Sequence, residues 1–200
     1  MFRLAAVLAF ATLLPALPAH ARLLDSQREH DGFFLRFQLG GGSMDAKWKD
    51  FGFSQSAGGP SGVFGLAMGG AIARNLILFG EVTRESATDP HVRFEDVRYR
   101  SRDLKLSQSG FGPGLAYYFM PVNLYLSGTM LFLRGSIEDD AGIDRTELGY
   151  GLKVALGKEW WISRDWGIGL AAIATFAGLP VDDAKIETTN LGLAFTATYN

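Results

Sequence analysis

The sequence contains no cysteine, which excludes disulfide bonds and thiolate metal sites from the fold. Histidine is scarce, with 3 residues in 200, so few groups are suited to acid–base or nucleophilic catalysis. A basic excess is missing too, because 19 Lys and Arg face 21 Asp and Glu, and the net charge of −2 gives no field that attracts nucleic acid. Prolines are few, 7 against 25 glycines, and aromatic residues make up 12% of the chain; this composition favours an all-β protein.

A short apolar run near the N-terminus predicts export. Residues 4–14 are apolar and follow a basic residue, but they are too few to span a membrane. Ala19 and Ala21 then supply the small residues that a signal peptidase prefers. We therefore expect a cleavable secretory signal peptide over residues 1–21 and a polar lead-in over residues 22–31.

A second stretch, residues 107–133, carries no charge and would pass a hydropathy test for a membrane helix. Pro113 and Pro121 interrupt it, and its glycines would further weaken a helix. Its apolar residues alternate with a period of two on either side of Pro121. Two strands joined by a turn are therefore expected here.

Apolar and polar residues alternate in this way in eight segments of the chain. In the first, Phe33, Phe37 and Leu39 share one face, and Arg36 lies on the other. Each segment has roughly ten residues, the length that a tilted strand needs to cross a bilayer. The segments are residues 32–41, 63–73, 76–84, 111–119, 122–132, 148–156, 166–176 and 191–199.

The connections between the segments alternate between long and short. The long, polar connections are residues 43–60, 85–107, 134–147 and 177–189, and the tight ones are residues 74–75, 120–121 and 163–165. Outer-membrane barrels have long extracellular loops and short periplasmic turns. The sequence therefore predicts an all-β fold, an eight-stranded antiparallel up-and-down transmembrane β-barrel over residues 32–200, with both termini on the periplasmic side.

The composition of the polar faces indicates which side of each strand is inside. These faces hold mostly Gly, Ala, Ser, Thr, Asn and Gln, with few charges. A soluble barrel such as a lipocalin would expose a face rich in Lys and Glu, whereas the narrow lumen of eight strands must be filled by small and polar side chains. We expect the apolar faces to point to lipid and the polar faces to the lumen.

Aromatic residues gather where this topology places the periplasmic rim, beside the tight turns and at the ends of the barrel. A girdle at a membrane interface accounts for such clustering, whereas the core of a soluble sandwich gives no reason to collect aromatic residues at one rim. The predicted girdle consists of Phe33, Tyr117, Phe119, Trp160, Trp166 and Tyr199.

Two phrases of the sequence add a resemblance to a known class. Residues 114–128 read GLAYYFMPVNLYLSG and residues 157–161 read GKEWW. With the repeated architecture, they resemble the small outer-membrane barrels of the OmpA/OmpX-like class, often called the outer membrane protein β-barrel domain. The resemblance covers residues 32–200. It implies a monomer in the cell outer membrane, in contact with lipid and lipopolysaccharide, that periplasmic chaperones and the barrel assembly machinery handle.

The face assignment directs five charged side chains into the lumen. A charge buried alone is very costly, so these side chains must pair. We expect a salt-bridge network that plugs the barrel, with Arg36 paired to Glu81 and Lys153 paired to Glu159. Structural filling is the favoured role, and the resemblance to OmpA permits a gate for small ions. The predicted network consists of Arg36, Glu81, Glu147, Lys153 and Glu159.

The second long connection carries a basic cluster that could contact lipopolysaccharide phosphates. Glu95, Asp96 and Asp103 neutralise this stretch, so a solvated hairpin extension is an alternative of equal standing. The acidic residues of the third connection lack the spacing of a calcium loop, and we expect no metal site and no cofactor. The candidate lipopolysaccharide contacts are Arg93, Arg98, Arg100, Arg102 and Lys105.

Catalysis has little support in the sequence. After the predicted signal peptide only His30 and His91 remain, and no Gly-x-Ser-x-Gly motif accompanies them. We therefore expect a non-enzymatic integral barrel with a structural or surface-interaction role and no nucleic-acid partner. The alternatives are a narrow gated pore for small ions or solutes and a lipid-modifying enzyme that acts through His91.

Overall fold

The computed structural model describes residues 30–50, 53–94, 97–100, 104–120, 122–139, 142–181 and 184–200. The predicted signal peptide, residues 1–21, and most of the predicted lead-in lie outside the described residues. None of the described residues forms a helix long and apolar enough to cross a membrane.

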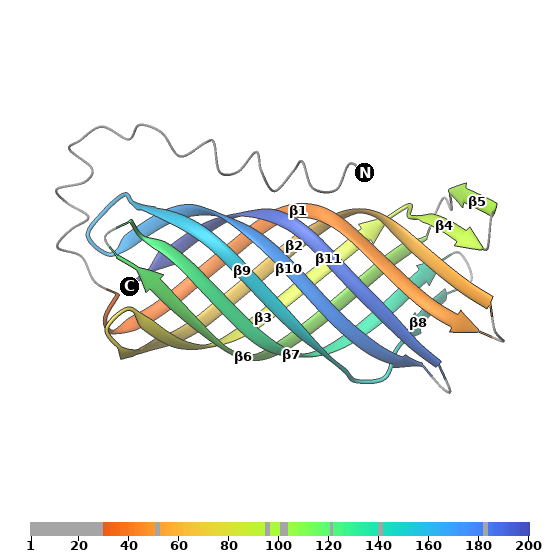
Figure 1. The fold of residues 1–200 in the computed structure, drawn as a ribbon, viewed down its shortest axis with the longest axis horizontal. Helices are drawn as coiled ribbons and strands as arrows, with labels where there is room; N and C mark the ends of the chain where they lie inside the picture. The colour runs from red at the N-terminus through yellow and green to blue at the C-terminus, as the bar shows by residue number, and fades with distance from the viewer. Residues whose placement is uncertain are drawn as a thin grey trace.

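Eight long antiparallel strands close into a barrel (Figure 1). Around the ring the order is β1-β11-β10-β9-β7-β6-β3-β2, and the pairing of β1 with β2 closes it. The predicted eight-stranded up-and-down fold is therefore confirmed. The long strands are β1 (Phe33–Asp50), β2 (Phe53–Ala73), β3 (Leu76–Thr88), β6 (Lys105–Phe119), β7 (Leu124–Asp139), β9 (Gly149–Trp161), β10 (Trp166–Val181) and β11 (Ala184–Tyr199). Short strands at one end are β4 (His91–Phe94), β5 (Val97–Arg100) and β8 (Gly142–Arg145).

The tight turns lie at the other end of the barrel, beside the C-terminus (Figure 1). The β2–β3 turn passes through Asn75 at φ 60° and the β6–β7 turn through Asn123 at φ 50°. Asparagine adopts this left-handed conformation more readily than most L residues, which is why the chain can reverse there without glycine. The backbone N–H of Asn200 donates to the carbonyl of Asp165 at 3.0 Å, so the C-terminus is held at the β9–β10 turn.

The strands are steeply tilted around the barrel axis. A row of paired residues that starts at Phe37 passes Val82 on β3 and Tyr150 on β9 and returns to β1 at Lys47. One circuit therefore advances ten residues along β1. A closed sheet of eight strands with such a stagger has its strands tilted by about 40°. Residues that meet across the lumen consequently lie at different distances, counted in residues, from the ends of their strands.

The polarity of the two faces reverses part of the way along the strands. On β1 the outward side chains are apolar up to Leu39 and polar from Ser43 to Lys47, while the inward side chains change from Arg36 to the buried Met44. Nearly all exposed large apolar side chains lie in the part of the barrel nearest the tight turns. They form an apolar belt of roughly ten residues per strand. Beyond the belt the same strands form a barrel with a polar exterior and an apolar interior.

The long predicted connections are, for this reason, largely strand. Residues 43–60 lie mostly in the β1–β2 hairpin, which remains paired up to Asp50 and Phe53. Residues 177–189 likewise continue β10 and β11, and β2 alone has 21 residues, about twice what a bilayer requires. The prediction of long loops was wrong because the alternation persists there with its faces exchanged, so that polar residues mark the outside of a strand.

Candidate functional site

The lower layer of the lumen, nearest the tight turns, is built around Arg36 on β1. Its Nε lies 3.5 Å from Oε1 of Glu159 on β9, and the two side chains are 2% and 1% exposed. Its Nη2 donates to the hydroxyl of Tyr118, which donates to Oε2 of Glu159 at 3.2 Å. The guanidinium carbon lies 3.8 Å from the centre of the Tyr125 ring. One carboxylate and two tyrosines thus compensate the burial of this cation.

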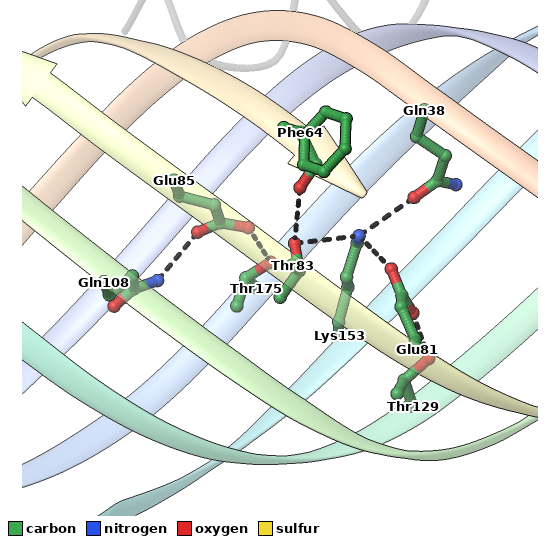
Figure 2. A network of polar contacts seen from close by, with 9 residues as sticks. All are labelled: Gln38, Phe64, Glu81, Thr83, Glu85, Gln108, Thr129, Lys153 and Thr175. Atoms are coloured by element: carbon green, nitrogen blue, oxygen red, sulfur yellow. Dashed lines mark hydrogen bonds and ion pairs between the residues drawn. The ribbon is translucent and has the colours of Figure 1, made fainter. Parts of the chain in front are cut away.

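The middle layer is built around Lys153 on β9 (Figure 2). Its Nζ forms an ion pair with Oε1 of Glu81 on β3 and donates to Oε1 of Gln38 at 2.9 Å. The second oxygen of Glu81 accepts a hydrogen bond from Oγ1 of Thr129 at 2.6 Å. The side chains of Lys153 and Glu81 are 2% and 5% exposed. Both charges therefore have a charged partner and further hydrogen bonds, as a buried pair requires.

The upper layer contains Glu85, the second residue after Thr83 on the inward face of β3 (Figure 2). Its two oxygens accept hydrogen bonds from Nε2 of Gln108 at 2.7 Å and from Oγ1 of Thr175 at 2.6 Å. Within the described residues no Lys or Arg forms an ion pair with this carboxylate. The buried carboxylates of the described lumen therefore outnumber its buried Lys and Arg by one. These five residues are Glu81, Glu85, Glu159, Arg36 and Lys153.

The predicted ion pairs exchange partners in the structure. We expected Arg36 with Glu81 and Lys153 with Glu159, but Arg36 pairs with Glu159 and Lys153 with Glu81. Lys153 and Glu159 lie on one face of the same strand, six residues apart, which separates their backbones by about 20 Å. Two side chains cannot bridge that distance. The tilt of the strands instead brings each basic residue to a carboxylate on another strand.

Glu147 does not belong to the lumen, contrary to the prediction. It lies in the segment between β8 and β9, is exposed, and its backbone N–H donates to the carbonyl of Pro180 at 3.0 Å. The prediction extended the alternation of β9 backward through Leu148, but the strand begins at Gly149.

His30 closes the lumen at the end of the tight turns. Sequence reasoning placed it only in the polar lead-in and assigned it no contact. Its ring stacks on Tyr118 at 3.5 Å, and its Nε2 lies 2.9 Å from Oδ1 of Asn123. Its backbone N–H donates to Oδ1 of Asn75 at 3.1 Å. Both asparagines are the left-handed residues of the tight turns, so the turns that end the barrel also hold His30 in place.

The part of the barrel beyond the apolar belt, at the end away from the tight turns, is called the outer extension. Its interior is closed by apolar side chains. One buried cluster there contains Met44, Ala46 and Leu106, with Trp48 packed against it. A cavity of about 30 Å³ lies among these residues, and another of about 10 Å³ lies beside Lys153. Cavities of this size hold one or two water molecules at most. Around Met44 and Leu106 and beside Lys153 the lumen is therefore filled by side chains, apart from space for these waters.

The six aromatic residues predicted as a girdle all lie at the end of the tight turns. Phe33, Tyr117, Phe119 and Trp166 are exposed, whereas Trp160 and Tyr199 are half-buried. Their rings contact one another along the rim: the Trp166 and Tyr199 centroids are 5.4 Å apart, and those of Tyr117 and Phe119 are 4.9 Å apart.

A second aromatic row, which the sequence analysis missed, lies at the opposite edge of the apolar belt. Phe111, Phe132 and Tyr150 are neighbours on β6, β7 and β9, with ring centroids 5.8 Å and 5.7 Å apart. The signal was present in the sequence for Phe111 and Phe132, because polar residues, Ser109 and Arg134, take the next outward positions on their strands. The belt thus has an aromatic row on both edges.

The basic cluster predicted to contact lipopolysaccharide lies at the outer end of the barrel. Arg93 belongs to β4, and Arg98 and Arg100 to β5, but their side chains are not described; Arg102 lies outside the described residues. Lys105 begins β6, and its Nζ lies 3.7 Å from Oε2 of Glu138. His91 on β4 is exposed, and within the described residues no side chain forms a hydrogen bond or ion pair with its ring.

No protein-family model matches the sequence, and no curated protein matches it. Among solved structures, Neisserial surface protein A (NspA) is similar with a TM-score of 0.54 at 16% identity, over 86% of this chain and 99% of that chain. The fold is that of a small outer-membrane β-barrel. The outer membrane protein OprG of Pseudomonas aeruginosa (TM-score 0.48, 12% identity, 85% and 98% of the two chains) is a weaker match. Ail of Yersinia pestis gives a TM-score of 0.42 at 13% identity, over 83% and 99%.

Proposed function

We propose that the protein is a non-enzymatic integral barrel of the outer membrane, closed to solutes, with a structural or surface-interaction role. The filled lumen carries this proposal. Two buried ion pairs, the carboxylate of Glu85 and an apolar outer core succeed one another along the axis, and the two cavities described beside them have volumes of about 30 and 10 Å³. A solute would have to break several of these layers at once.

The outer-membrane location is supported by the outward belt, its two aromatic rows and the similarity of the fold to NspA. Export would use the signal peptide proposed for residues 1–21. N-terminal sequencing of the protein from the outer-membrane fraction should then begin at Arg22. A folded barrel should also migrate differently on a gel before and after boiling, and an unchanged mobility would contradict the membrane-barrel proposal.

Planar-bilayer recording tests whether the barrel is closed. The wild type and Glu81→Ala should both be silent, because the Arg36–Glu159 layer and the outer apolar core remain in the variant. Insertion into the bilayer is checked in the same preparation by protease protection. Steady single-channel currents in the wild type would overturn the closed barrel.

A gated pore is the second candidate, and one observation favours it. Lys153 Nζ lies 3.4 Å from Oγ1 of Thr83, the residue midway between Glu81 and Glu85 on the inward face of β3. Glu85 has no basic partner among the described residues, so it offers Lys153 a second position. Under this hypothesis Glu81→Ala opens the middle layer and gives currents that the wild type lacks, whereas silence in both removes the pore.

Surface interaction remains a proposal for the outer end. Arg93, Arg98, Arg100 and Arg102 are the proposed contacts to lipopolysaccharide phosphates, and Lys105 is a weaker candidate because it pairs with Glu138. We also propose, from the resemblance to small outer-membrane barrels, that the protein is a monomer delivered by periplasmic chaperones to the barrel assembly machinery. No observation favours a lipid-modifying role for His91.

A further inference from the structure

The outward wall of the barrel is hollowed at one place. A groove of about 570 Å³ lies across β2, β3, β6 and β7. At its outward positions Gly80 and Pro113 leave the wall without long side chains, Val82 and Phe111 line it, and the inward-facing Gly112 belongs to its floor. At Gly80 no atom lies within 4 Å of the position that a Cβ would take. Because Gly80, Val82, Phe111 and Pro113 are exposed outward positions, the hollow opens to the outside of the barrel, and the inward-facing Phe79 and Glu81 lie beneath it.

The groove lies in the half of the apolar belt that adjoins the outer extension. Val82, Phe111 and Phe132 are paired neighbours on β3, β6 and β7, and each stands in the last apolar row before the exterior turns polar. A membrane lipid that occupies the groove would therefore belong to the outer leaflet, in the orientation proposed above.

A basic row stands directly above the groove. One outward position farther along the three strands lie Arg84, Ser109 and Arg134, which are paired neighbours and all exposed. Arg84 and Arg134 flank β6, so their backbones are about 10 Å apart, or two inter-strand spacings. Within the described residues neither guanidinium forms an ion pair. Long basic side chains at this depth reach the headgroup level of a bilayer.

We infer that this groove and the basic row above it form a binding site for a phosphorylated glycolipid of the outer leaflet, the chemistry of lipid A. An acyl chain would fill the hollow over Gly80, and Arg84, Ser109 and Arg134 would bind headgroup phosphate. Two cations on strands that flank a serine suit a headgroup with two separated phosphates better than one with a single phosphate. The site is distinct from the arginines proposed for the outer hairpin. The inference rests on the proposed membrane location and not on the closed lumen.

The electrostatic half of the site is tested by lipid retention in native mass spectrometry. The folded full-length mature chain in detergent is titrated with lipid A and, separately, with phosphatidylglycerol. Removing either arginine alone should weaken lipid A retention about fivefold. The double variant Arg84→Ala/Arg134→Ala should therefore lose more than either single variant. Lys47→Ala/Lys185→Ala removes two exposed positive charges from β1 and β11, away from the groove, and should change retention little.

The apolar half is tested by filling the groove. Gly80→Leu should lower lipid A retention, whereas Gly128→Leu should not. Gly128 is a matched control because it also lies on a strand with no atom within 4 Å of its Cβ position, but outside the groove. Gel mobility before and after boiling confirms that each variant is folded. If the wild type shows no difference in mobility between unheated and boiled samples, the membrane-barrel proposal itself fails. That outcome is distinguishable from failure of the lipid site.

Three results would overturn the inference in folded protein. Equal losses in the arginine and lysine double variants would reduce the effect to net charge. Unchanged retention in Gly80→Leu would show that the groove holds no chain. Equal retention of phosphatidylglycerol and lipid A by the wild type would contradict the assignment to a glycolipid with two phosphates.

Discussion

The lower ion pair of the lumen permits a quantitative prediction. Glu159→Gln keeps the size of the side chain but removes the carboxylate that pairs with Arg36. Both side chains are almost completely buried, so water cannot compensate the arginine that remains. Breaking a buried pair from one side costs about 3–5 kcal/mol, and we expect a loss of that size in the free energy of unfolding. The hydroxyl of Tyr118 and the ring of Tyr125 still contact the guanidinium and should keep the loss near the lower limit.

The assay is urea unfolding of the barrel in lipid vesicles, followed by tryptophan fluorescence and by gel mobility. The exposed pair Lys105–Glu138 provides the control. Its side chains are 42% and 51% exposed at 3.7 Å, so Glu138→Gln should cost less than about 1 kcal/mol. The double variant Arg36→Met/Glu159→Met should recover most of the loss, because it leaves no unpaired charge in the lower layer. A cost for Glu159→Gln as small as that of Glu138→Gln would refute the reasoning.

Three further predictions use the same unfolding assay or amide exchange. Glu81→Gln should cost about 3 kcal/mol in the free energy of unfolding because it leaves Lys153 unpaired. Glu85→Gln should change that free energy by at most about 1 kcal/mol, because no described basic residue pairs with Glu85. Equal costs would contradict the assignment of Glu85 as the carboxylate without a basic partner. Gly157→Ala should cost about 1–3 kcal/mol, since its Cβ would clash with the Tyr125 ring, and a neutral result like that expected of Gly128→Ala would show that the ring moves aside. His30→Ala should raise the amide exchange rate of Asn75, whose N–H donates to the His30 carbonyl at 3.3 Å, because the ring no longer holds residue 30 against the turns. An unchanged rate would show that the histidine ring does not stabilise this end of the barrel.

The architecture was predictable because local patterns decide it. Alternation identified the strands of the apolar belt, and the tight turns at residues 74–75 and 163–165 fixed their connectivity. The extent of the strands was not predictable by the same rule. At Ser43 on β1 the apolar residues move from the outward to the inward face, and a stretch with polar residues at the expected apolar positions was taken for a loop.

The charged interior was predictable in its members more than in its contacts. Arg36, Glu81, Lys153 and Glu159 were found because each interrupts a face of small residues. Their pairing depends on the stagger of the whole ring, which no single strand encodes. Glu85 was missed because the predicted strand ended at residue 84, whereas β3 continues to Thr88.

The extension of the strands beyond the belt determines how the outer surface is presented. The outermost part of the β1–β2 hairpin stands on a continuous ladder of hydrogen bonds, and an apolar core supports it from within. A partner that binds at this height would meet a surface that is already ordered, and so would not have to offset the entropy of fixing a mobile loop. In the proposed orientation, this arrangement separates surface interaction from membrane insertion. Substitutions of the outward polar side chains beyond the apolar belt should change the surface that a partner meets without disturbing the belt itself.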